Sequence, residues 1–291
     1  MKKNTVKGLI FLFLAAIVWG LAFVAQRVGA DSISPMYFNG VRFFIGGLSL
    51  IPVILLFEKG ADDKGKKKTT LWAGILAGIV LAVASFLQQV GVELTDSAGK
   101  SGFITGLYMI LVPIIGLFFG AKSKAKTWIG AILGILGLFM ICMNGTKMTF
   151  TTGDLFLIAD AVMFAFHIII IDHFGDRVYF LRFSMVQFFT TAVISMGGAL
   201  IFEEVTFEPL VLAIIPILYC GIMSVGVGYT FQVIGQKYSE PTSAAIILST
   251  EAVWSAIFGA IILSERMGVI AYIGCALIFA GIIVTQLKTK E

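Results

Sequence analysis

Charged and metal-binding residues are scarce in this chain. Only 13% of the 291 residues are charged, and there are three cysteines and two histidines. Cys142, Cys220 and Cys275 all fall in apolar segments, a pattern that indicates neither a disulfide framework nor a metal site. A P-loop, a Gly-rich nucleotide fingerprint and an HExxH motif are also missing from the sequence. The net charge of +4 needs no nucleic acid to explain it. We therefore predict no cofactor, no metal and no nucleic-acid partner.

Apolar residues are abundant instead. They make up 58% of the chain, and the mean hydropathy is +0.99, more apolar surface than a soluble domain of this size can bury. A spanning helix needs about 20 apolar residues. The sequence predicts ten such spans, at residues 8–26, 35–57, 71–91, 99–119, 127–143, 153–171, 183–202, 210–236, 242–263 and 268–287. The fourth begins among small and polar residues, and the eighth is long and interrupted by glycines.

The chain repeats itself internally. Residues 8–58 align with residues 153–203 without a gap at an offset of 145, and later segments align at 143 or 144. The aligned pairs include Glu58 with Glu203 and Gln89 with Gln232. We predict a first unit at 1–145, a connecting loop at 146–152 and a second unit at 153–291. Five spans in each unit would invert the second unit in the membrane, an architecture typical of secondary transporters.

Basic residues set the expected orientation, because Lys and Arg gather in cytoplasmic loops. With the N-terminus inside, sixteen of the 21 basic residues lie on the cytoplasmic side, four lie outside and Arg42 lies within a span. The lysines before the first span, Lys2, Lys3 and Lys7, also fit a signal peptide, but the apolar run continues as a span without a cleavage pattern. The predicted fold class is therefore all-α: ten transmembrane helices, two inverted five-helix repeats and both termini cytoplasmic.

Two stretches resemble the ten-helix EamA-type branch of the drug/metabolite transporter superfamily. They are FLQQVGVELTDSAGKSGFITGLYMILVPIIG at residues 86–116 and SEPTSAAIILSTEAVWSAIFGAIILSER at residues 239–266. Val92, Glu93, Asp96 and Asp160 depart from the usual pattern. The resemblance implies a carrier of small metabolites, commonly an exporter of amino acids or related compounds. It also implies a central cavity lined by helices one to four and six to nine.

Ionisable residues inside the predicted spans are the first candidates for function, because a charge at the bilayer centre costs about 2.5–3.5 kcal/mol. Glu251 is either a proton-coupling or amine-binding carboxylate, or a structural group bonded to a neighbouring helix. Asp160 and His167 lie seven residues apart, so they share a helix face. One interpretation is that the two residues form a proton relay. The other is that His167 donates a hydrogen bond to a backbone carbonyl of another helix. We expect Arg42 to pair with a carboxylate such as Asp160 or Glu93.

Polar and aromatic residues within the spans are candidates for lining a substrate cavity. They are Trp19, Gln88, Gln89, Tyr108, Gln232 and Trp254, joined by Lys100 at the start of the fourth span. The glutamines can equally hold helices together, and the aromatics can face lipid or core. Lys100 binds a substrate carboxylate, pairs with an acid such as Glu251, or extends to the outer interface.

The sequence thus favours a secondary transporter in the plasma membrane, most simply the bacterial inner membrane. It would export a small polar or zwitterionic metabolite, such as an amino acid, coupled to protons and by alternating access. The partners expected are the substrate, protons and the lipid bilayer. The protein would be a monomer or a homodimer, since the spacing of Gly130, Gly134 and Gly137 suits either internal packing or a dimer face. The alternatives are a proton-independent uniporter or exchanger, and a non-transporting scaffold or sensor.

Overall fold

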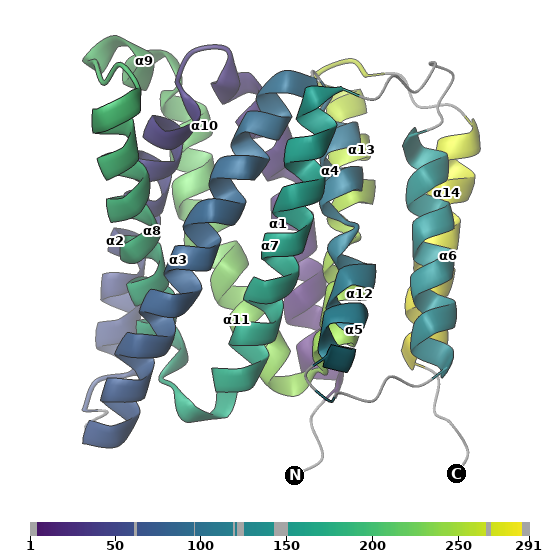
Figure 1. Cartoon of the computed structure of the whole chain (residues 1–291), viewed down its shortest axis with the longest axis horizontal. Helices are drawn as coiled ribbons and strands as arrows, with labels where there is room; N and C mark the ends of the chain where they lie inside the picture. Colours follow the sequence, from purple (N-terminus) through teal and green to yellow (C-terminus); the bar gives the residue numbers. More distant parts are fainter. Residues whose placement is uncertain are drawn as a thin grey trace.

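The computed structural model describes residues 5–60, 63–95, 97–118, 120, 125–142, 151–265 and 269–286. These residues form a bundle of helices and contain no β-strand (Figure 1). The first part of the chain supplies α1 Thr5–Ala30, α2 Pro35–Phe57, α3 Lys64–Thr95, α4 Ala98–Thr105, α5 Tyr108–Phe118 and α6 Ala125–Cys142. The second part supplies α7 Thr152–Phe174, η1 Gly175–Arg177, α8 Phe180–Phe202, α9 Phe207–Leu212, α10 Ile214–Leu218, η2 Tyr219–Tyr229, α11 Thr230–Tyr238, α12 Pro241–Leu248, α13 Glu251–Ile262 and α14 Val269–Gln286.

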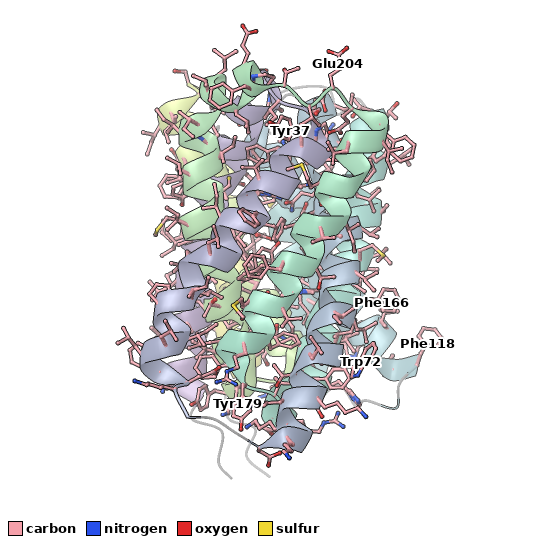
Figure 2. The ribbon with its side chains drawn as sticks, turned by 90° about the vertical axis from the view of Figure 1, so that its left-hand side faces the viewer. Tyr37, Trp72, Phe118, Phe166, Tyr179 and Glu204 are labelled. Carbon is pink, nitrogen blue, oxygen red and sulfur yellow. The ribbon has the colours of Figure 1, made fainter. Side chains whose placement is uncertain are left out.

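Eight helical stretches of the described chain are long and apolar enough to cross a membrane, and α6 and α14 contain shorter apolar stretches. Large apolar side chains project outward around the bundle, among them Trp72, Phe118 and Phe166 (Figure 2). Phe118 is 85% exposed and Trp72 is 62% exposed, which is stable when the surrounding solvent is lipid. The bundle is therefore that of a polytopic membrane protein.

Helix α1 begins and helix α14 finishes at the same end of the bundle, called here the near end (Figure 1). Helices α1 and α3 begin at the near end, and α2, α7 and α11 finish there. The opposite end, where α1 finishes, is called the far end. Helices α6 and α14 pack on each other at one side of the bundle. A Cβ built on Gly281 would lie 2.7 Å from the Gly130 carbonyl oxygen, so this contact has no room for side chains.

Three of the predicted spans are interrupted. The fourth is divided into α4 and α5 at Gly106, and the ninth into α12 and α13 at Ser249 and Thr250. Ser249 and Thr250 donate their hydroxyls to the carbonyls of Ile246 and Ile247, at 2.8 and 2.7 Å. Such bonds compete with regular helix geometry. The eighth contains the 11-residue π-helix η2, which carries three glycines and so has weak helical preference.

Two glutamates connect the two parts of the chain in matching ways. Glu203 accepts the backbone N–H groups of Met36 (3.0 Å) and Tyr37 (2.8 Å) at the start of α2. Glu58 accepts those of Leu181 (3.0 Å) and Arg182 (3.2 Å) at the start of α8. Each carboxylate therefore satisfies free N–H groups and faces the positive end of a helix dipole. Since each helix ends where the other begins, α2 and α8 are antiparallel.

Two glycine contacts match in the same way, one at each end of the bundle. At the far end, a Cβ on Gly91 would lie 2.5 Å from Leu157 and 3.2 Å from the Gly153 carbonyl oxygen. At the near end, a Cβ on Gly235 would lie 2.6 Å from Leu12 and 3.2 Å from the Gly8 carbonyl oxygen. Glycine thus lets α3 approach α7 closely at the far end and lets α11 approach α1 closely at the near end.

Because the Glu58 and Glu203 carboxylates cap the starts of α8 and α2, removing either one is predicted to lower the stability of the protein. Glu58→Ala and Glu203→Ala are each expected to lower the free energy of unfolding by about 1–3 kcal/mol, because two helix N–H groups lose a charged acceptor. Thermal unfolding of the purified protein in detergent measures the effect. Glu204→Ala, at the exposed neighbouring position, is the control and should leave the melting temperature unchanged. Equal melting temperatures for all three variants would contradict the capping role.

Candidate functional site

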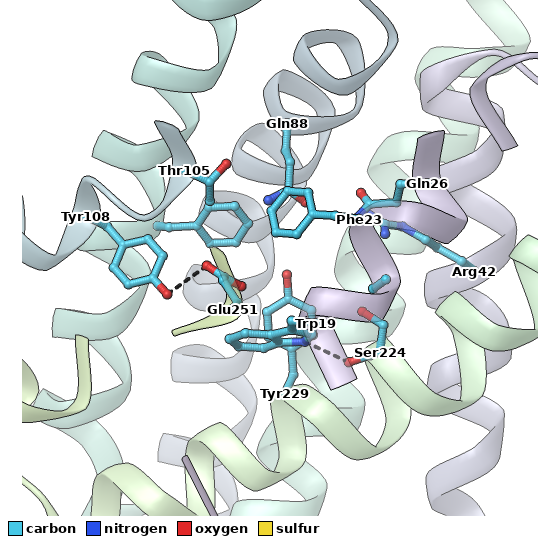
Figure 3. Close-up of a pocket in the computed structure, with 12 residues that line it drawn as sticks. Trp19, Phe23, Gln26, Arg42, Gln88, Thr105, Tyr108, Ser224, Tyr229 and Glu251 are labelled. Atoms are coloured by element: carbon cyan, nitrogen blue, oxygen red, sulfur yellow. Dashed lines mark hydrogen bonds between the residues drawn. The ribbon is translucent and has the colours of Figure 1, made fainter. Parts of the chain in front are cut away.

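A small cavity lies between the middle of the bundle and its far end. It is lined by Trp19, Ala22, Phe23, Gln26, Arg42, Gln88, Thr105, Tyr108, Phe164, Ser224, Tyr229 and Glu251 (Figure 3). The volume of this cavity is about 30 Å³. Since one water needs ~10–15 Å³ on this measure, the cavity holds only a few waters. The cavity in this structure is therefore small.

The helix interruptions place two polar side chains against each other at the centre of the bundle. Tyr108 is the first residue of α5 and Glu251 is the first residue of α13. The Tyr108 hydroxyl donates a 2.8 Å hydrogen bond to Glu251 Oε1. Glu251 is only 3% exposed, so this carboxyl lies inside the protein and borders the cavity.

A second carboxyl lies next to this pair. Asp160, on α7, is completely buried, and its Oδ2 accepts a 3.0 Å hydrogen bond from the Thr105 hydroxyl. Its Oδ1 has no hydrogen-bond partner within the described chain. Among the described residues, no Lys, Arg or His forms an ion pair with Asp160 or Glu251. A bare carboxylate in such surroundings is costly, so its charge is offset by a bound proton or by a cationic group of a ligand.

Aromatic rings form one wall of the cavity. The Trp19 indole N–H donates to the Ser224 carbonyl in the π-helix η2 at 3.1 Å (Figure 3). Its ring centroid lies 4.8 Å from that of Tyr229. Phe23 and Phe164 complete the aromatic lining. Such rings suit apolar or cationic parts of a ligand, because the face of an aromatic ring attracts positive charge.

Arg42 borders the cavity on the side away from Glu251 and Tyr108 (Figure 3). Our expectation of a carboxylate partner is wrong for the described residues. The Arg42 Nε instead donates to Asn39 Oδ1 at 2.8 Å, and Asn39 Nδ2 donates to the Ser85 carbonyl at 3.0 Å. The guanidinium also lies 5.2 and 5.1 Å from the ring centroids of Phe38 and Phe43. The amide orients this cation without neutralising it, so Arg42 can attract an anionic group.

Four of the predicted site residues border the cavity together: Trp19, Gln88, Tyr108 and Glu251. Asp160 touches the site through Thr105. His167 is turned away toward α8, where its Nε2 lies 2.9 Å from Gln187 Oε1. Asp160 and His167, which the sequence placed on one face, therefore have separate polar partners.

Four further predicted residues lie outside the lining. Gln89 donates through Nε2 to the Gln26 carbonyl at 3.2 Å and so links α3 to α1. Gln232 is 2% exposed and points into the protein on α11, and Trp254 stacks near Phe258 with ring centroids 6.1 Å apart. Lys100 forms a 2.7 Å ion pair with Asp154 rather than with Glu251.

Lys100 therefore joins α4 to α7 at the far end. Asp154, its partner, is 2% exposed and also accepts the Thr151 backbone N–H at 2.7 Å. Glu265 adds a second bond nearby, since it accepts the backbone N–H of Ala98 at 3.1 Å. These charged contacts hold the start of α4 against its neighbours at the far end.

Sequence reasoning missed several lining residues, notably Phe23, Gln26, Thr105 and Ser224. Gln26, Thr105 and Ser224 are polar residues in or beside predicted spans, and that signal could have found them. Phe23 could not be distinguished in this way, because the chain contains 26 phenylalanines. Only the rotation of α1 within the bundle directs this ring into the cavity.

Known proteins provide an independent comparison. Residues 6–143, and again residues 151–287, match the EamA-like transporter family. An uncharacterized transporter of Archaeoglobus fulgidus is 30% identical over 282 residues, which cover 95% of this chain and 85% of the relative. The uncharacterized transporter YoaV of Bacillus subtilis is 24% identical over 286 residues, covering 95% and 96%. A solved crystal structure superposes with a TM-score of 0.80 and 20% identity over 97% of each chain, so the fold is shared.

Proposed function

The chain belongs to the EamA-like transporter family, and from this premise we propose that it exports a small polar or zwitterionic metabolite, such as an amino acid, coupled to protons. It is a multi-pass integral membrane transporter rather than an enzyme. The observation that carries the proposal is the buried Tyr108–Glu251 pair, which lies where two helices are interrupted and borders the cavity. Interrupted helices at mid-membrane are a common way to build a transport site.

The proposed architecture has ten spans in two inverted units, at 1–145 and 153–291, with both termini cytoplasmic. Three observations support it. Within the described chain, basic residues gather beside the helix ends at the near end, namely Lys59, Lys64, Lys66, Lys67, Lys68, Arg177, Arg182 and Lys237. Glu58 and Glu203 make matching contacts with residues 145 positions apart. The breaks at Gly106 and Ser249, 143 positions apart, divide two spans in the same way.

The chemistry of the cavity supports a substrate with both polar and charged groups. Arg42 provides a positive charge on one side, and Glu251 with Tyr108 provides a carboxyl on the other. Trp19 and Tyr229 add an aromatic surface between polar groups. A zwitterion would place its carboxylate toward Arg42 and its ammonium toward Glu251, where the charges are complementary.

Proton coupling is proposed for Glu251 and Asp160. Both carboxyls are buried, and within the described chain they accept hydrogen bonds from the neutral hydroxyls of Tyr108 and Thr105. A proton or a substrate ammonium can each offset the carboxylate charge, so the two compete for the same group. That competition is the simplest link between proton movement in one direction and substrate movement in the other. His167 is less suited to this step, because it contacts Gln187 instead of either acid.

Transport requires the bundle to open, since the closed cavity holds only a few waters. The glycine contact between α3 and α7 closes the far end, and the contact between α11 and α1 closes the near end. We propose that these two contacts separate in turn during the transport cycle. The substrate would then reach the central carboxyl from one side at a time.

The function is tested with purified protein and a panel of amino acids, nucleobases, polyamines and quaternary amines. Amino acids are expected to raise the melting temperature, and the best of them should exchange across reconstituted vesicles in counterflow. A pH gradient should then drive its accumulation. Exchange without response to the gradient would favour a uniporter or exchanger. If no compound shifts the melting temperature or exchanges, the transport proposal fails and a scaffold or sensor role is favoured.

A further inference from the structure

A second group of polar side chains is buried between the middle of the bundle and the near end. It consists of His167 on α7, Ser184 and Gln187 on α8, and Gln232 on α11, each at most 2% exposed. His167 Nε2 lies 2.9 Å from Gln187 Oε1, and α11 packs against both α7 and α8. Within the described chain, four of their polar atoms have no hydrogen-bond partner: His167 Nδ1, Ser184 Oγ, Gln187 Nε2 and Gln232 Oε1. Buried polar groups are normally paired. Four unpaired atoms in one group therefore call for an explanation.

These four residues are called here the inner cluster, and the side chain of Tyr229 separates them from the cavity. The Tyr229 ring borders the cavity and lies 4.8 Å from the Trp19 ring, centroid to centroid. The His167 ring packs edge-on against Tyr229 with the centroids 5.9 Å apart. Tyr229 ends the π-helix η2, which carries the glycines at 221, 226 and 228. A ring at the end of an irregular, glycine-containing helix can move without breaking regular helix bonds.

The inner cluster occupies positions that match those around Arg42. Asn39 and Arg42 are the fifth and eighth residues of α2, and Ser184 and Gln187 are the fifth and eighth residues of α8. The neighbouring contacts match as well. A Cβ on Gly221 would lie 3.0 Å from the Arg42 carbonyl oxygen, and a Cβ on Gly78 would lie 2.7 Å from the Gln187 carbonyl oxygen. The two polar groups thus occupy matching positions in the two parts of the chain, and Arg42 of the first group borders the small cavity described above.

We propose that His167, Ser184, Gln187 and Gln232 form an inner substrate subsite, which becomes accessible from the near end when the far-end cavity closes. This inference rests on the proposed transport function and assigns to it a second binding position. The subsite offers neutral donors and acceptors, whereas the cavity half offers the Arg42 guanidinium. It therefore suits hydroxyl, amine or amide groups of the substrate and holds a carboxylate less firmly than Arg42 does. The Tyr229 ring lies between the two binding positions, and the substrate passes this ring when it moves from one position to the other.

Accessibility of single cysteines to a membrane-impermeant maleimide tests the subsite without knowledge of the substrate. Cys142, Cys220 and Cys275 are first replaced by alanine. The cysteine of Ser184→Cys then reports the accessibility of the inner cluster to the maleimide, and the cysteine of Gln88→Cys reports the accessibility of the cavity. Ser184→Cys is expected to react in inside-out vesicles and not in right-side-out vesicles. Gln88→Cys is expected to show the reverse.

Two outcomes separate this inference from the proposed function. Failure of Ser184→Cys to react from the near end, while Gln88→Cys reacts from the far end, overturns the subsite but leaves the cavity as a transport site. Failure of both variants to react from either side removes the aqueous pathway and overturns the transport function as well. Val193→Cys, on the same helix but 72% exposed at the outer surface, is the lipid-facing control and should react from neither side. Gln232→Cys repeats the test in case Ser184→Cys folds poorly.

Discussion

Vesicles that contain the Glu251→Gln variant are expected to lose all pH-gradient-driven accumulation of the best amino-acid substrate while retaining its exchange. The amide has nearly the shape of the carboxyl and can still accept the Tyr108 hydroxyl, so the 2.8 Å contact can be kept. It cannot take up or release a proton. The coupled step is therefore lost, whereas the cavity and the movement of the helices remain. Uptake of radiolabelled amino acid with and without an imposed pH gradient measures both quantities.

Glu204→Gln is the matched control, because it makes the same chemical change at an exposed residue of the far-end loop. It should accumulate substrate as the unaltered protein does. Tyr108→Phe separates the carboxyl from its hydrogen bond. That variant should lower the free energy of unfolding by about 1–3 kcal/mol, because the buried Glu251 carboxyl loses its hydrogen-bond donor. Gradient-driven accumulation by Glu251→Gln at the normal level would show that coupling does not involve this residue.

Gly91→Val and Gly235→Val are expected to hold the protein open at opposite ends. A side chain at Gly91 would collide with Leu157 and separate α3 from α7 at the far end. A side chain at Gly235 would collide with Leu12 and separate α11 from α1 at the near end. Overpacking of this kind costs about 1–3 kcal/mol, which amounts to a shift of about 5- to 160-fold in the ratio of the two states. Both variants should lose net transport, because each disfavours one half of the cycle.

The direction of the shift is measured with the cavity reporter Gln88→Cys. Its reaction with impermeant maleimide from the far end should become faster in Gly91→Val and slower in Gly235→Val. Gly197→Val is the control, because a Cβ at Gly197 meets nothing within 4 Å. It should change neither transport nor labelling. An identical change of labelling rate in Gly91→Val and Gly235→Val would indicate general destabilisation, and would contradict the assignment of separate closures at the two ends.

Much of the fold could be predicted from the sequence, because lipid imposes a simple length and polarity requirement on each helix. The predicted second and seventh spans correspond closely to α2 and α8. Irregularity was also predicted for the eighth span, where the glycines now lie in η2. The interruption of the ninth span at Ser249 was not predicted. Serine and threonine are common within membrane helices, so only their hydrogen bonds to Ile246 and Ile247 reveal the break.

The site was predictable in its residue types and less so in its pairings. Trp19, Gln88, Tyr108 and Glu251 were identified because polar and aromatic groups inside apolar helices need a reason to be there. The partner of Arg42 could not be identified in this way. Asn39 is three residues away on the same helix, but a carboxylate elsewhere was the more obvious electrostatic partner. Helix rotation and packing decide between such alternatives, and neither is encoded in a local pattern.

What the sequence determined by itself is therefore the membrane environment, the approximate positions of the apolar helices and the gapless alignment of residues 8–58 with residues 153–203. These depend on properties that add along the chain: apolar length, charge bias and alignment at a constant offset. Only the tertiary structure decided that Tyr108 meets Glu251, that Lys100 binds Asp154 and that His167 contacts Gln187. Each of these pairs joins two helices. Which side chains meet depends on how closely small residues such as Gly91 and Gly235 let the helices approach, and on how each helix is rotated against its neighbours.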